Sequence, residues 1–275
     1  MQKIIVKKNI YNENGLLIIP KDTCIQLSET MKTRLRNLGV LDEILSEEQN
    51  NHTTELIEKD EFQDKVSNFK EKHLLSKNKL LSDAIDIVQN LIFNSKQQKW
   101  HLYLHTLINH DEILYSHSLD TALLTALIGA KLNFSEERLN DLVLGALFHD
   151  IGLVLTPFSI IQKGNNLSKE ENIIYKNHCN LGCSMVANVI DSPIIKSIIL
   201  QHHERLDGSG YPNNLKYYEI SLDAQIVMVA ETFNSATLHT PYKNAKDPKI
   251  VIKEMLENKH KFPERIVKCL IEIIN

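Results

Sequence analysis

The sequence predicts a mainly α-helical protein in two parts. A small α/β module with a helical connector is expected over residues 1–78, and a large helical domain over residues 79–275. Three observations predict this division: strand-like alternation is confined to the first fifty residues, a polar segment follows, and apolar residues then recur at helical spacing. With 275 residues and 43% hydrophobic content, the chain is long enough to bury a sizeable core.

The N-terminal module is predicted from two apolar runs, "KIIVKKN" and "GLLIIP", on either side of "IYNENG". Asn14 and Gly15 between such runs favour a turn, so a short β-meander is expected. "QLSETMKTRLRNLGV" then places four apolar residues at helical spacing and ends at Gly39, which suits a helix C-cap. Residues 46–78 are mostly polar and charged, which favours a solvated helix as the connector.

Eight helical patterns follow the connector. They are "KLLSDAIDIVQNLIF", "SHSLDTALLTALIGAKL", "SEERLNDLVLGALFHDIG", "SKEENIIYKNHCNLGCSMVANVI", "PIIKSIILQHHE", "SLDAQIVMVAETFNSAT", "IVIKEMLEN" and "PERIVKCLIEII". None of them alternates as a strand does, so the region is predicted to be all-α. Ser168 and Glu171 form a capping box, Ser135 is an expected N-cap, and Gly152 is a residue on which a helix can end.

Composition excludes several classes of protein. Thirty-one Lys and Arg against 35 Asp and Glu give a formal net charge of −4, which argues against duplex nucleic acid as a partner. No apolar run approaches the ~20 residues of a membrane span and the first residues lack a secretory signal, so a cytoplasmic location is expected. The four cysteines form no CxxC pair, which disfavours both a disulfide framework and a Cys-ligated zinc site.

Polar residues that can bind metals interrupt the apolar helices. They are His117, His149, Asp150, His178, His202, His203 and Glu231. Any one of them alone is best explained as a half-buried polar residue with a hydrogen-bond partner. Seven such groups buried without partners would cost on the order of 1 kcal/mol or more each, whereas a shared metal cluster would satisfy them all.

The adjacent pair His149 and Asp150 suits such a cluster. Neighbouring side chains on a helix diverge by about 100°, so Asp150 can share one cation with His149 and reach a second cation with its other oxygen. Nitrogen and oxygen ligands without thiolate suit iron, manganese, nickel or zinc and disfavour a structural zinc site. Two metals that share a carboxylate can activate water and stabilise both oxygens of an in-line displacement at phosphorus, so phosphoester hydrolysis is the leading reaction class.

The motifs "HDIG", "KNHCNLG", "HHERLDGSGYP" and "IVMVAETFNSATLHTPY" occur in this order over roughly residues 100–275. In order and spacing they resemble HD-GYP proteins, a branch of the HD phosphohydrolase superfamily. The resemblance implies a helical HD-type domain with two metals, occasionally three, that are usually iron or manganese. It also implies hydrolysis of cyclic di-GMP to linear pGpG, in some members on to GMP, while some relatives prefer other cyclic dinucleotides.

The resemblance also assigns roles to residues of this chain. The metal ligands carried over are His117, the pair His149 and Asp150, and Glu231 for the superfamily site, with His178, His202 and His203 completing a second metal. Asp150 bridges the metals and is the catalytic residue. Tyr211 is expected to bind a phosphate or a guanine of the substrate, and Lys243 its other phosphate. Arg205 and Asp207 are also assigned to the substrate-binding site, where with Glu204 they are expected to brace the loop through ion pairs. The N-terminal segment resembles the small leading module of many such proteins.

The chain departs from the family pattern at several positions. The lysine that steadies the scissile phosphate is Leu153 here, and losing one such donor typically costs about 10²- to 10³-fold in rate. Glu231 replaces the usual aspartate, with Asn234 at the second acidic position, and its extra methylene shifts the ligand oxygen. Thr240 replaces an arginine that would bind phosphate in a bidentate manner. Ile113 stands where a third metal would need glutamate, so two divalent metals, iron or manganese, are expected.

Three functions remain open from the sequence. The first is a metal-dependent phosphodiesterase that hydrolyses cyclic di-GMP or a related cyclic dinucleotide to the linear dinucleotide, with a metal-activated hydroxide as nucleophile. The second is a catalytically weakened signalling domain that binds a cyclic dinucleotide or a protein partner, motivated by Leu153, Glu231 and Thr240. The third is hydrolysis of another phosphoester, such as a nucleotide monophosphate. The N-terminal module could dock on the helical domain or mediate a homodimer.

Overall fold

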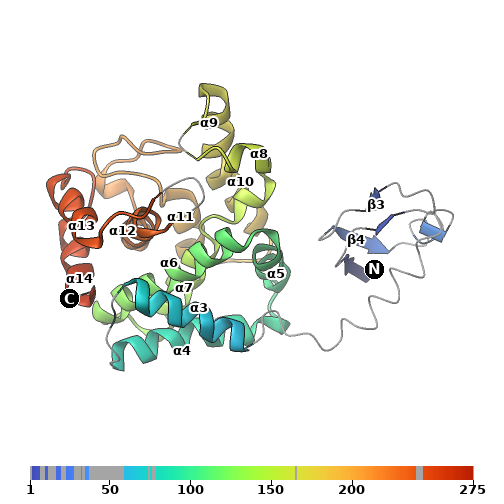
Figure 1. The fold of residues 1–275 in the computed structure, drawn as a ribbon, viewed down its shortest axis with the longest axis horizontal. Helices are drawn as coiled ribbons and strands as arrows, with labels where there is room; N and C mark the ends of the chain where they lie inside the picture. The colour runs from blue at the N-terminus through green and yellow to red at the C-terminus, as the bar shows by residue number, and fades with distance from the viewer. Residues whose placement is uncertain are drawn as a thin grey trace. The chain divides into compact units, whose positions relative to one another are not determined.

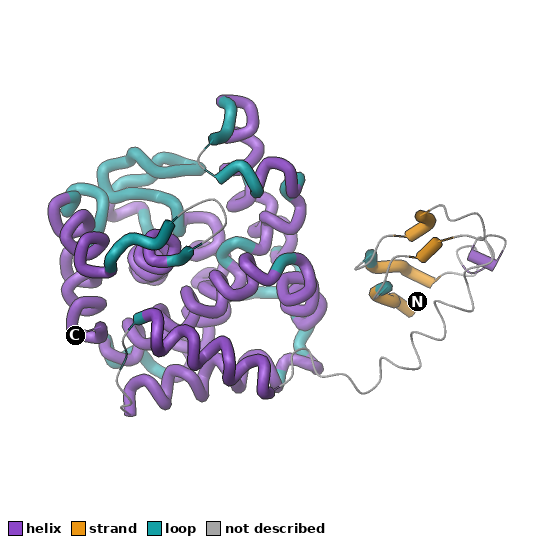
Figure 2. The backbone as a smooth tube through the Cα atoms, viewed as in Figure 1, coloured by secondary structure: helices purple, strands orange, loops and turns teal. Residues whose placement is uncertain are grey.

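A computed structural model describes residues 2–6, 10–11, 17–19, 23–27, 32, 35–36, 59–73, 75, 79–164, 166–239 and 244–274. The chain divides into two compact units, residues 1–58 and residues 59–275, and each is described by itself. The described elements are mainly helical, as the sequence predicts (Figures 1 and 2).

The first unit contains four short strands among its described residues. They are β1 (Gln2–Ile5), β2 (Ile10–Tyr11), β3 (Leu17–Ile19) and β4 (Cys24–Leu27). Strand β1 pairs antiparallel with β4, and β2 pairs antiparallel with β3, so the pairing is nested and not the sequential pairing of the expected meander. Of the helix expected next, only Lys32, Leu35 and Arg36 are described, each as helical. The turn at Asn14 and the C-cap at Gly39 lie outside the described residues, so the α/β module stays a prediction.

The helical unit begins with two helices that lie side by side, α3 (Lys59–Lys72) and α4 (Lys79–Phe93) (Figure 1). Phe62 of α3 packs edge-on against Phe93 of α4, with ring centroids 5.7 Å apart. Phe62, Val66 and Phe69 of α3 are all buried. The solvated connector expected over residues 46–78 is therefore wrong for α3, because its few apolar residues share one face and that face packs into the core.

Two long apolar helices, α6 (Glu112–Lys131) and α7 (Glu136–Phe148), form the centre of the helical unit, and two shorter elements precede them. These are η1 (Ser95–Gln97) and α5 (His101–His110). Ser135 caps α7 as predicted, because its hydroxyl accepts a hydrogen bond from the Arg138 backbone N–H. Helix α6 has the length and composition of a membrane span, but 83% of that stretch is buried within the protein, a pattern that a core helix also gives.

The next elements carry the HD motif and the histidines that follow it. They are η2 (Ile151–Leu155), α8 (Phe158–Ile161), α9 (Lys169–Lys176), α10 (His178–Val186) and α11 (Pro193–Gln201). The predicted capping box of Ser168 and Glu171 is confirmed at the start of α9. The single helix expected from Ser168 onward is instead two helices, α9 and α10, which meet at Asn177.

Gly152 lies within η2, whereas the sequence predicts the end of a helix at this residue. A Cβ atom built at Gly152 would lie 2.0 Å from the carbonyl oxygen of His178 and 2.6 Å from the backbone nitrogen of Gly182. Only glycine allows this close approach of η2 and α10. The residue therefore brings the HD motif next to the first turn of the helix that begins with His178.

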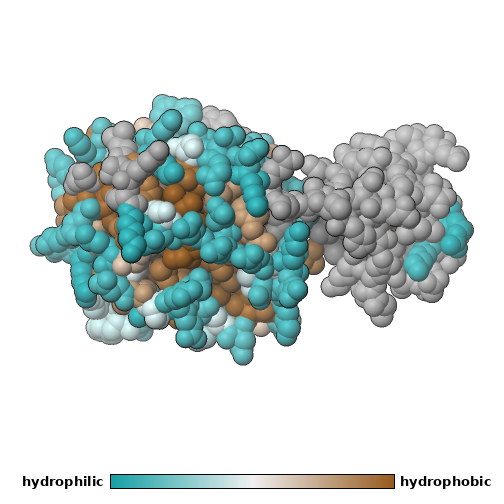
Figure 3. Space-filling model, turned by 90° about the horizontal axis from the view of Figure 1, so that it is seen from below, coloured by the Kyte–Doolittle hydropathy of each residue, from teal (hydrophilic) through white to brown (hydrophobic). Residues whose placement is uncertain are grey.

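The remaining elements complete the helical unit. They are η3 (Tyr217–Glu219), α12 (Leu222–Thr237), α13 (Pro248–Glu257) and α14 (Glu264–Ile274). Helix α6 packs against α4, α7 and α12, and α11 packs against α7, α10 and α12. The helices that contain or flank the predicted metal ligands thus pack against one another. Seen from below, the unit shows hydrophobic side chains among hydrophilic ones (Figure 3).

Candidate metal centre

Six of the seven predicted metal ligands come together, although they lie on separate elements. His117 is in the middle of α6, His149 and Asp150 join α7 to η2, His178 begins α10, and His202 and His203 follow α11. They form two groups in which the ligand atoms lie within 4.8 Å of one another. One group is His117, His149 and Asp150, and the other is Asp150, His178, His202 and His203.

Asp150 belongs to both groups because its two oxygens face different histidines. Its Oδ2 lies 3.3 Å from Nε2 of His149 and 3.8 Å from Nε2 of His117. Its Oδ1 lies 3.2 Å from Nε2 of His178 and 3.5 Å from Nε2 of His202. The bridging position that the sequence predicts for Asp150 is thus the position it occupies between the two groups.

Three of these histidines are oriented by the ends of helices. In each case the ring Nδ1 lies close to the carbonyl oxygen of the residue three positions earlier. The distances are 2.6 Å for His149 and Ala146, 2.7 Å for His178 and Tyr175, and 3.0 Å for His202 and Ile199. A carbonyl can only accept, so each Nδ1 donates. The last carbonyls of a helix have no partner in the helix, and the imidazole satisfies one of them. Each Nε2 is thereby turned toward Asp150, as outer hydrogen bonds do in metal sites.

His117 is oriented differently because it lies within a helix. Its Nδ1 lies 3.1 Å from the side-chain nitrogen of Asn234 on α12. The same nitrogen donates to the His117 carbonyl oxygen at 3.0 Å and to the Thr121 hydroxyl at 3.1 Å. The other end of the amide accepts a hydrogen bond from Lys72.

The charges around Asp150 favour a positive charge on each side of it. Burial acts to raise the pKa of Asp150, but the neighbouring imidazoles, His149 foremost, hold it well below its usual range. Burial would lower the pKa of His149 and of His178, yet the Asp150 carboxylate raises both above the ordinary value. Burial lowers the pKa of His202 to about 4 and that of His117 to about 3.

The donor set fits divalent cations. Asp150 Oδ1 is buried and has no hydrogen bond of acceptable geometry among the described residues. Nε2 of His117 lies 3.3 Å from Nε2 of His149, and Nε2 of His178 lies 3.4 Å from Nε2 of His202. Buried ring nitrogens this close to one another, around a carboxylate with a low pKa, form an arrangement that a metal ion would stabilise. Imidazole and carboxylate without thiolate suit iron, manganese or zinc.

The HD domain family model matches residues 75–265, which is more than half of the chain and includes both groups. The chain belongs to the HD domain family. The match begins after α3, so Lys72 lies outside it.

Curated relatives of this HD domain protein support its resemblance to the HD-GYP branch. It is 34% identical over 164 residues to a cyclic di-GMP phosphodiesterase of Thermotoga maritima, covering 58% of this chain and 44% of that protein. It is 28% identical over 174 residues to a cyclic di-GMP phosphodiesterase of Pseudomonas aeruginosa (63% and 42%). It is 31% identical over 134 residues to a 3'3'-cGAMP-specific phosphodiesterase of Vibrio cholerae (49% and 31%). The chain thus spans less than half the length of these relatives.

A solved structure also has a similar fold. It is Bd1817, an HDG"Y"P protein from Bdellovibrio bacteriovorus, with a TM-score of 0.53 and 18% identity. The match covers 100% of this chain and 95% of that chain. The HD-GYP resemblance expected from the sequence motifs is confirmed by these relatives together with the family match.

Glu231 is the predicted ligand that neither group includes. It lies on α12 and is 8% exposed, and its carboxylate accepts a hydrogen bond from the Thr232 hydroxyl at 3.2 Å. Burial raises the pKa of Glu231, and the negative charge of Asp150 adds to the effect. In the HD domain protein without a cation, these two carboxylates repel each other. The assignment of Glu231 as a ligand stays a prediction.

The loop after His203 is held by a buried carboxylate. Both oxygens of Glu204 accept backbone N–H groups of the loop, from Asn213 at 2.7 Å and from Leu215 at 3.0 Å. A Cβ atom at Gly210 would lie 2.4 Å from the Glu204 Cα, so the loop packs directly on the backbone that follows His203. The expected bracing by Glu204 is therefore made through backbone hydrogen bonds and not through an ion pair.

The predicted substrate-binding residues lie at different distances from the cluster. The Tyr211 ring stacks on His203, with centroids 4.6 Å apart, so it lies beside the second group. Arg205 donates to the Thr232 hydroxyl and lies over the Phe262 ring. Asp207 accepts the Ser209 backbone N–H and stabilises its own turn. Lys243, like Thr240, lies outside the described residues, and all four substrate-binding assignments stay predictions.

Sequence reasoning missed the side chains behind His117. Lys72 donates to the Asn234 carbonyl oxygen and to Asp120 Oδ2, the latter at 3.1 Å. Asn234 was noticed only as a departure from an acidic pattern, and Lys72 lies in a segment interpreted as a connector. The one signal available was the pair of polar residues, Asp120 and Asn234, within otherwise apolar helices.

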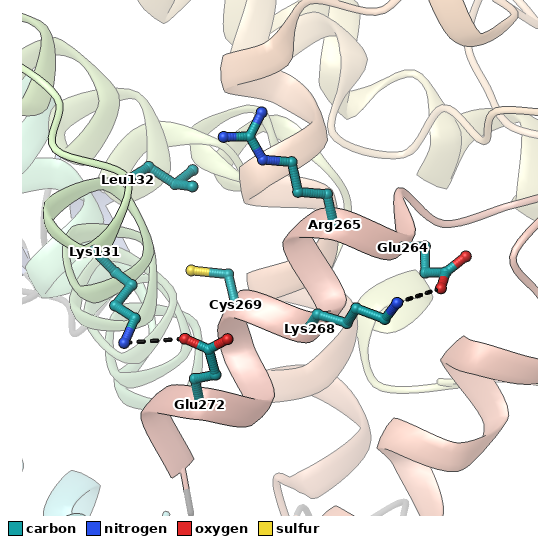
Figure 4. Close-up of a pocket in the computed structure, with 7 residues that line it drawn as sticks. All are labelled: Lys131, Leu132, Glu264, Arg265, Lys268, Cys269 and Glu272. Atoms are coloured by element: carbon teal, nitrogen blue, oxygen red, sulfur yellow. Dashed lines mark ion pairs between the residues drawn. The ribbon is translucent and has the colours of Figure 1, made fainter.

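A hollow of about 550 Å³ lies elsewhere on the helical unit, beside α14 (Figure 4). Its charged side chains pair with one another: Lys131 lies 3.0 Å from Glu272, and Lys268 lies 2.7 Å from Glu264. No histidine is among the described residues that line it. The two ion pairs satisfy most of its charged side chains, and the described residues that line it include no group of metal ligands close enough to share an ion, so the Asp150 cluster is the better candidate site.

Proposed function

We propose that the chain is a metal-dependent phosphodiesterase that hydrolyses cyclic di-GMP, or a related cyclic dinucleotide such as cGAMP, to the linear dinucleotide. The observation that carries the proposal is the position of Asp150, whose two oxygens face two separate groups of imidazole nitrogens. The names of the curated relatives support the substrate class.

In this proposal His117, His149 and Asp150 hold one divalent cation, and Asp150, His178, His202 and His203 hold the other. The ions are iron or manganese. When bound, such a pair lowers the pKa of water and stabilises the attacking and leaving oxygens of an in-line displacement. Asp150 keeps its negative charge because its pKa is well below the ordinary value, so it remains a ligand at any physiological pH.

Tyr211 is proposed to bind the substrate beside this cluster. Its ring lies on His203 and within 5.0 Å of the Lys176 ammonium, so a ligand that reaches the second group would meet an aromatic face and a positive charge together. Aromatic faces bind bases by stacking, and ammonium groups bind phosphate. Lys243 is proposed as a further phosphate contact.

The test is a product assay on protein loaded with Fe²⁺ or Mn²⁺ without oxygen. The expected result is linear pGpG from cyclic di-GMP, or the corresponding linear product from cGAMP, as separated by chromatography. The absence of any linear product with both metals and both substrates would contradict the proposal. Competition by nucleotide monophosphates in the same assay separates this activity from hydrolysis of a different phosphoester.

A second candidate is a signalling domain that binds the cyclic dinucleotide, or a protein partner, with little or no turnover. Leu153 favours it, because this residue in η2 is 4% exposed and supplies no charge to the scissile phosphate. Leu153→Lys tests it, with Leu153→Met as a control of similar length without charge. Tight binding without turnover in the native chain, followed by hydrolysis in Leu153→Lys alone, would support this candidate. Equal rates in all three proteins would remove its rationale.

A further inference from the structure

His117 differs from the other histidines in what its Nδ1 faces. Nδ1 of His149, His178 and His202 faces carbonyl oxygens, which require a proton on Nδ1. Nδ1 of His117 faces the side-chain nitrogen of Asn234 at 3.1 Å. The amide nitrogen has two hydrogens and cannot accept a hydrogen bond, so a proton on Nδ1 of His117 would point at a donor, and the contact favours Nδ1 without a proton.

The orientation of the Asn234 amide is fixed at its other end. An ammonium group has donors and no acceptor, and Lys72 Nζ meets Asn234 Oδ1. Turning the amide over would place its NH₂ group against that ammonium. The present orientation also places the amide nitrogen beside the His117 carbonyl oxygen and the Thr121 hydroxyl, and its two hydrogens are shared among these oxygens and His117 Nδ1. Asn234 is fully buried, so water cannot replace any of these partners.

Lys72 is itself held in place by a second partner. Its Nζ lies 3.1 Å from Asp120 Oδ2, and the two side chains are only 19% and 11% exposed. Burial lowers the pKa of Lys72, whereas the Asp120 carboxylate raises it and fixes the position of the ammonium group. Helix α3, which carries Lys72, therefore acts on α6 and α12 at the same point.

The proton of neutral His117 must then be on Nε2. That atom is the one that lies 3.3 Å from Nε2 of His149 and faces Asp150 Oδ2. A metal ligand must offer an unprotonated nitrogen, so binding a cation here requires His117 to move its proton to Nδ1, against Asn234. The charge of Lys72 opposes a cation at the same place.

We propose that Lys72 and Asn234 are positioning residues that hold His117 in its Nε2–H form. This weakens the site formed by His117, His149 and Asp150, and the site formed by Asp150, His178, His202 and His203 fills first. The inference rests on the proposed function in one respect, that the cluster holds two divalent cations. It adds that the two sites differ in their affinity for the cation. The residue of α3 that causes this difference, Lys72, lies outside the family match.

Two substitutions test the proposal. Asn234→Asp places a carboxylate that accepts a proton from His117 Nδ1 and still pairs with Lys72. Lys72→Met removes the charge that opposes a cation and one of the contacts that hold the amide in place. Each is expected to tighten the weaker site about 10- to 100-fold, the range typical of outer hydrogen bonds to metal ligands. Lys65→Met is the matched control, because Lys65 lies on the same helix and bonds to Ser116 and not to Asn234.

Two readouts follow these variants. Calorimetric titration with Mn²⁺ gives the stoichiometry and both dissociation constants. Nitrogen-15 spectra of the metal-free protein assign the proton of His117, which is expected on Nε2 in the native chain and in Lys65→Met, and on Nδ1 in Asn234→Asp.

The outcomes separate the two proposals. Two Mn²⁺ sites of equal affinity in the native chain, or a His117 proton already on Nδ1, would overturn this inference and leave the proposed function standing. No Mn²⁺ binding in any of the four proteins would overturn the proposed function and this inference with it. Unequal sites in the native chain that become more equal in both variants, and not in Lys65→Met, are the result expected here.

Discussion

The two sides of Asp150 are built in different ways. On the Oδ1 side, His178 and His202 take their orientation from backbone carbonyls of the adjacent helix ends. On the Oδ2 side, His149 does the same, but His117 depends on Asn234, a side chain 117 positions away in the sequence. The carbonyl groups come with the helix ends and are hard to lose by substitution. The side-chain network can change with a single residue, so it is where affinity can be tuned.

The largest expected effect is that of Asp150→Asn, because Asp150 is what the two sides share. The amide keeps the shape but loses the charge and one ligand oxygen. Loss of an outer hydrogen bond costs 10- to 100-fold in metal affinity, so loss of the shared ligand is expected to cost at least about 100-fold at both sites. Elemental analysis after anaerobic loading and desalting measures it. Retention of either cation at native affinity would show that the site holding it does not depend on Asp150.

Gly152→Ala is expected to damage the Oδ1 side selectively. The new Cβ would lie 2.0 Å from the His178 carbonyl oxygen, and this backbone atom can move only with α10. Overpacking of this kind costs about 1–3 kcal/mol in stability, and it moves His178 away from Asp150. Urea unfolding and Mn²⁺ titration measure the two effects.

Gly129→Ala is the control for Gly152→Ala. Its Cβ would also be crowded, at 2.6 Å from Leu139 Cδ1, but that atom is the end of a flexible side chain far along α7 from the cluster. It should cost some stability and leave Mn²⁺ binding unchanged. Equal metal affinities in both variants would show that the contact of η2 with α10 does not position His178.

Much of the candidate site could be predicted from the sequence, because its residues reveal themselves locally. His117, His149, Asp150 and His178 are polar residues in apolar helices, and this contrast is visible without any structure. The histidines at helix ends also donate their Nδ1 hydrogen bonds to carbonyl oxygens only three positions earlier in the chain. Features of the site that depend on neighbouring residues can therefore be recognised in the sequence.

The rest depends on contacts between distant residues. Lys72 and Asn234 are 162 positions apart, and nothing in the polar sequence around Lys72 indicates that it reaches a buried amide. The three buried apolar residues of α3 were too few for periodicity to separate a packed helix from a solvated one. The motif predicts Glu231 as a ligand, but its carboxylate belongs to neither group of ligand atoms. The position of a residue in a motif therefore does not by itself fix where its side chain lies.

Glu204→Gln is expected to loosen the loop on the Oδ1 side. The glutamate is fully buried and accepts two backbone N–H groups, whereas glutamine offers one oxygen and would set its NH₂ against the other N–H group. A buried donor without a partner costs about 1–3 kcal/mol. Urea unfolding measures the loss, with Glu219→Gln at an exposed position as the control. If stability is unchanged, the loop is held by the packing of Gly210 and not by Glu204.

The smallest expected effect concerns His73, which follows Lys72 and lies behind the His117 side. His73 is 2% exposed, packs between Phe69 and Phe233, and has no hydrogen-bond partner for either ring nitrogen among the described residues. Burial, helped by the charge of Lys72, lowers its pKa to about 3. Between pH 6.5 and 3 the unfolded chain therefore binds a proton that the native protein does not, so stability falls as the pH falls.

His73→Leu should remove this acid sensitivity. At pH 5, about 1.5 units below the ordinary pKa of histidine, protonation of His73 in the unfolded chain lowers the free energy of unfolding by about 2 kcal/mol. The variant should not show this loss. Urea unfolding at pH 7.5 and pH 5 in the presence of a chelator measures the difference, and His260→Leu, at an exposed position, is the control. The same pH dependence in His73→Leu as in the native chain would mean that other buried histidines with a lowered pKa, such as His117 and His202, account for the acid sensitivity.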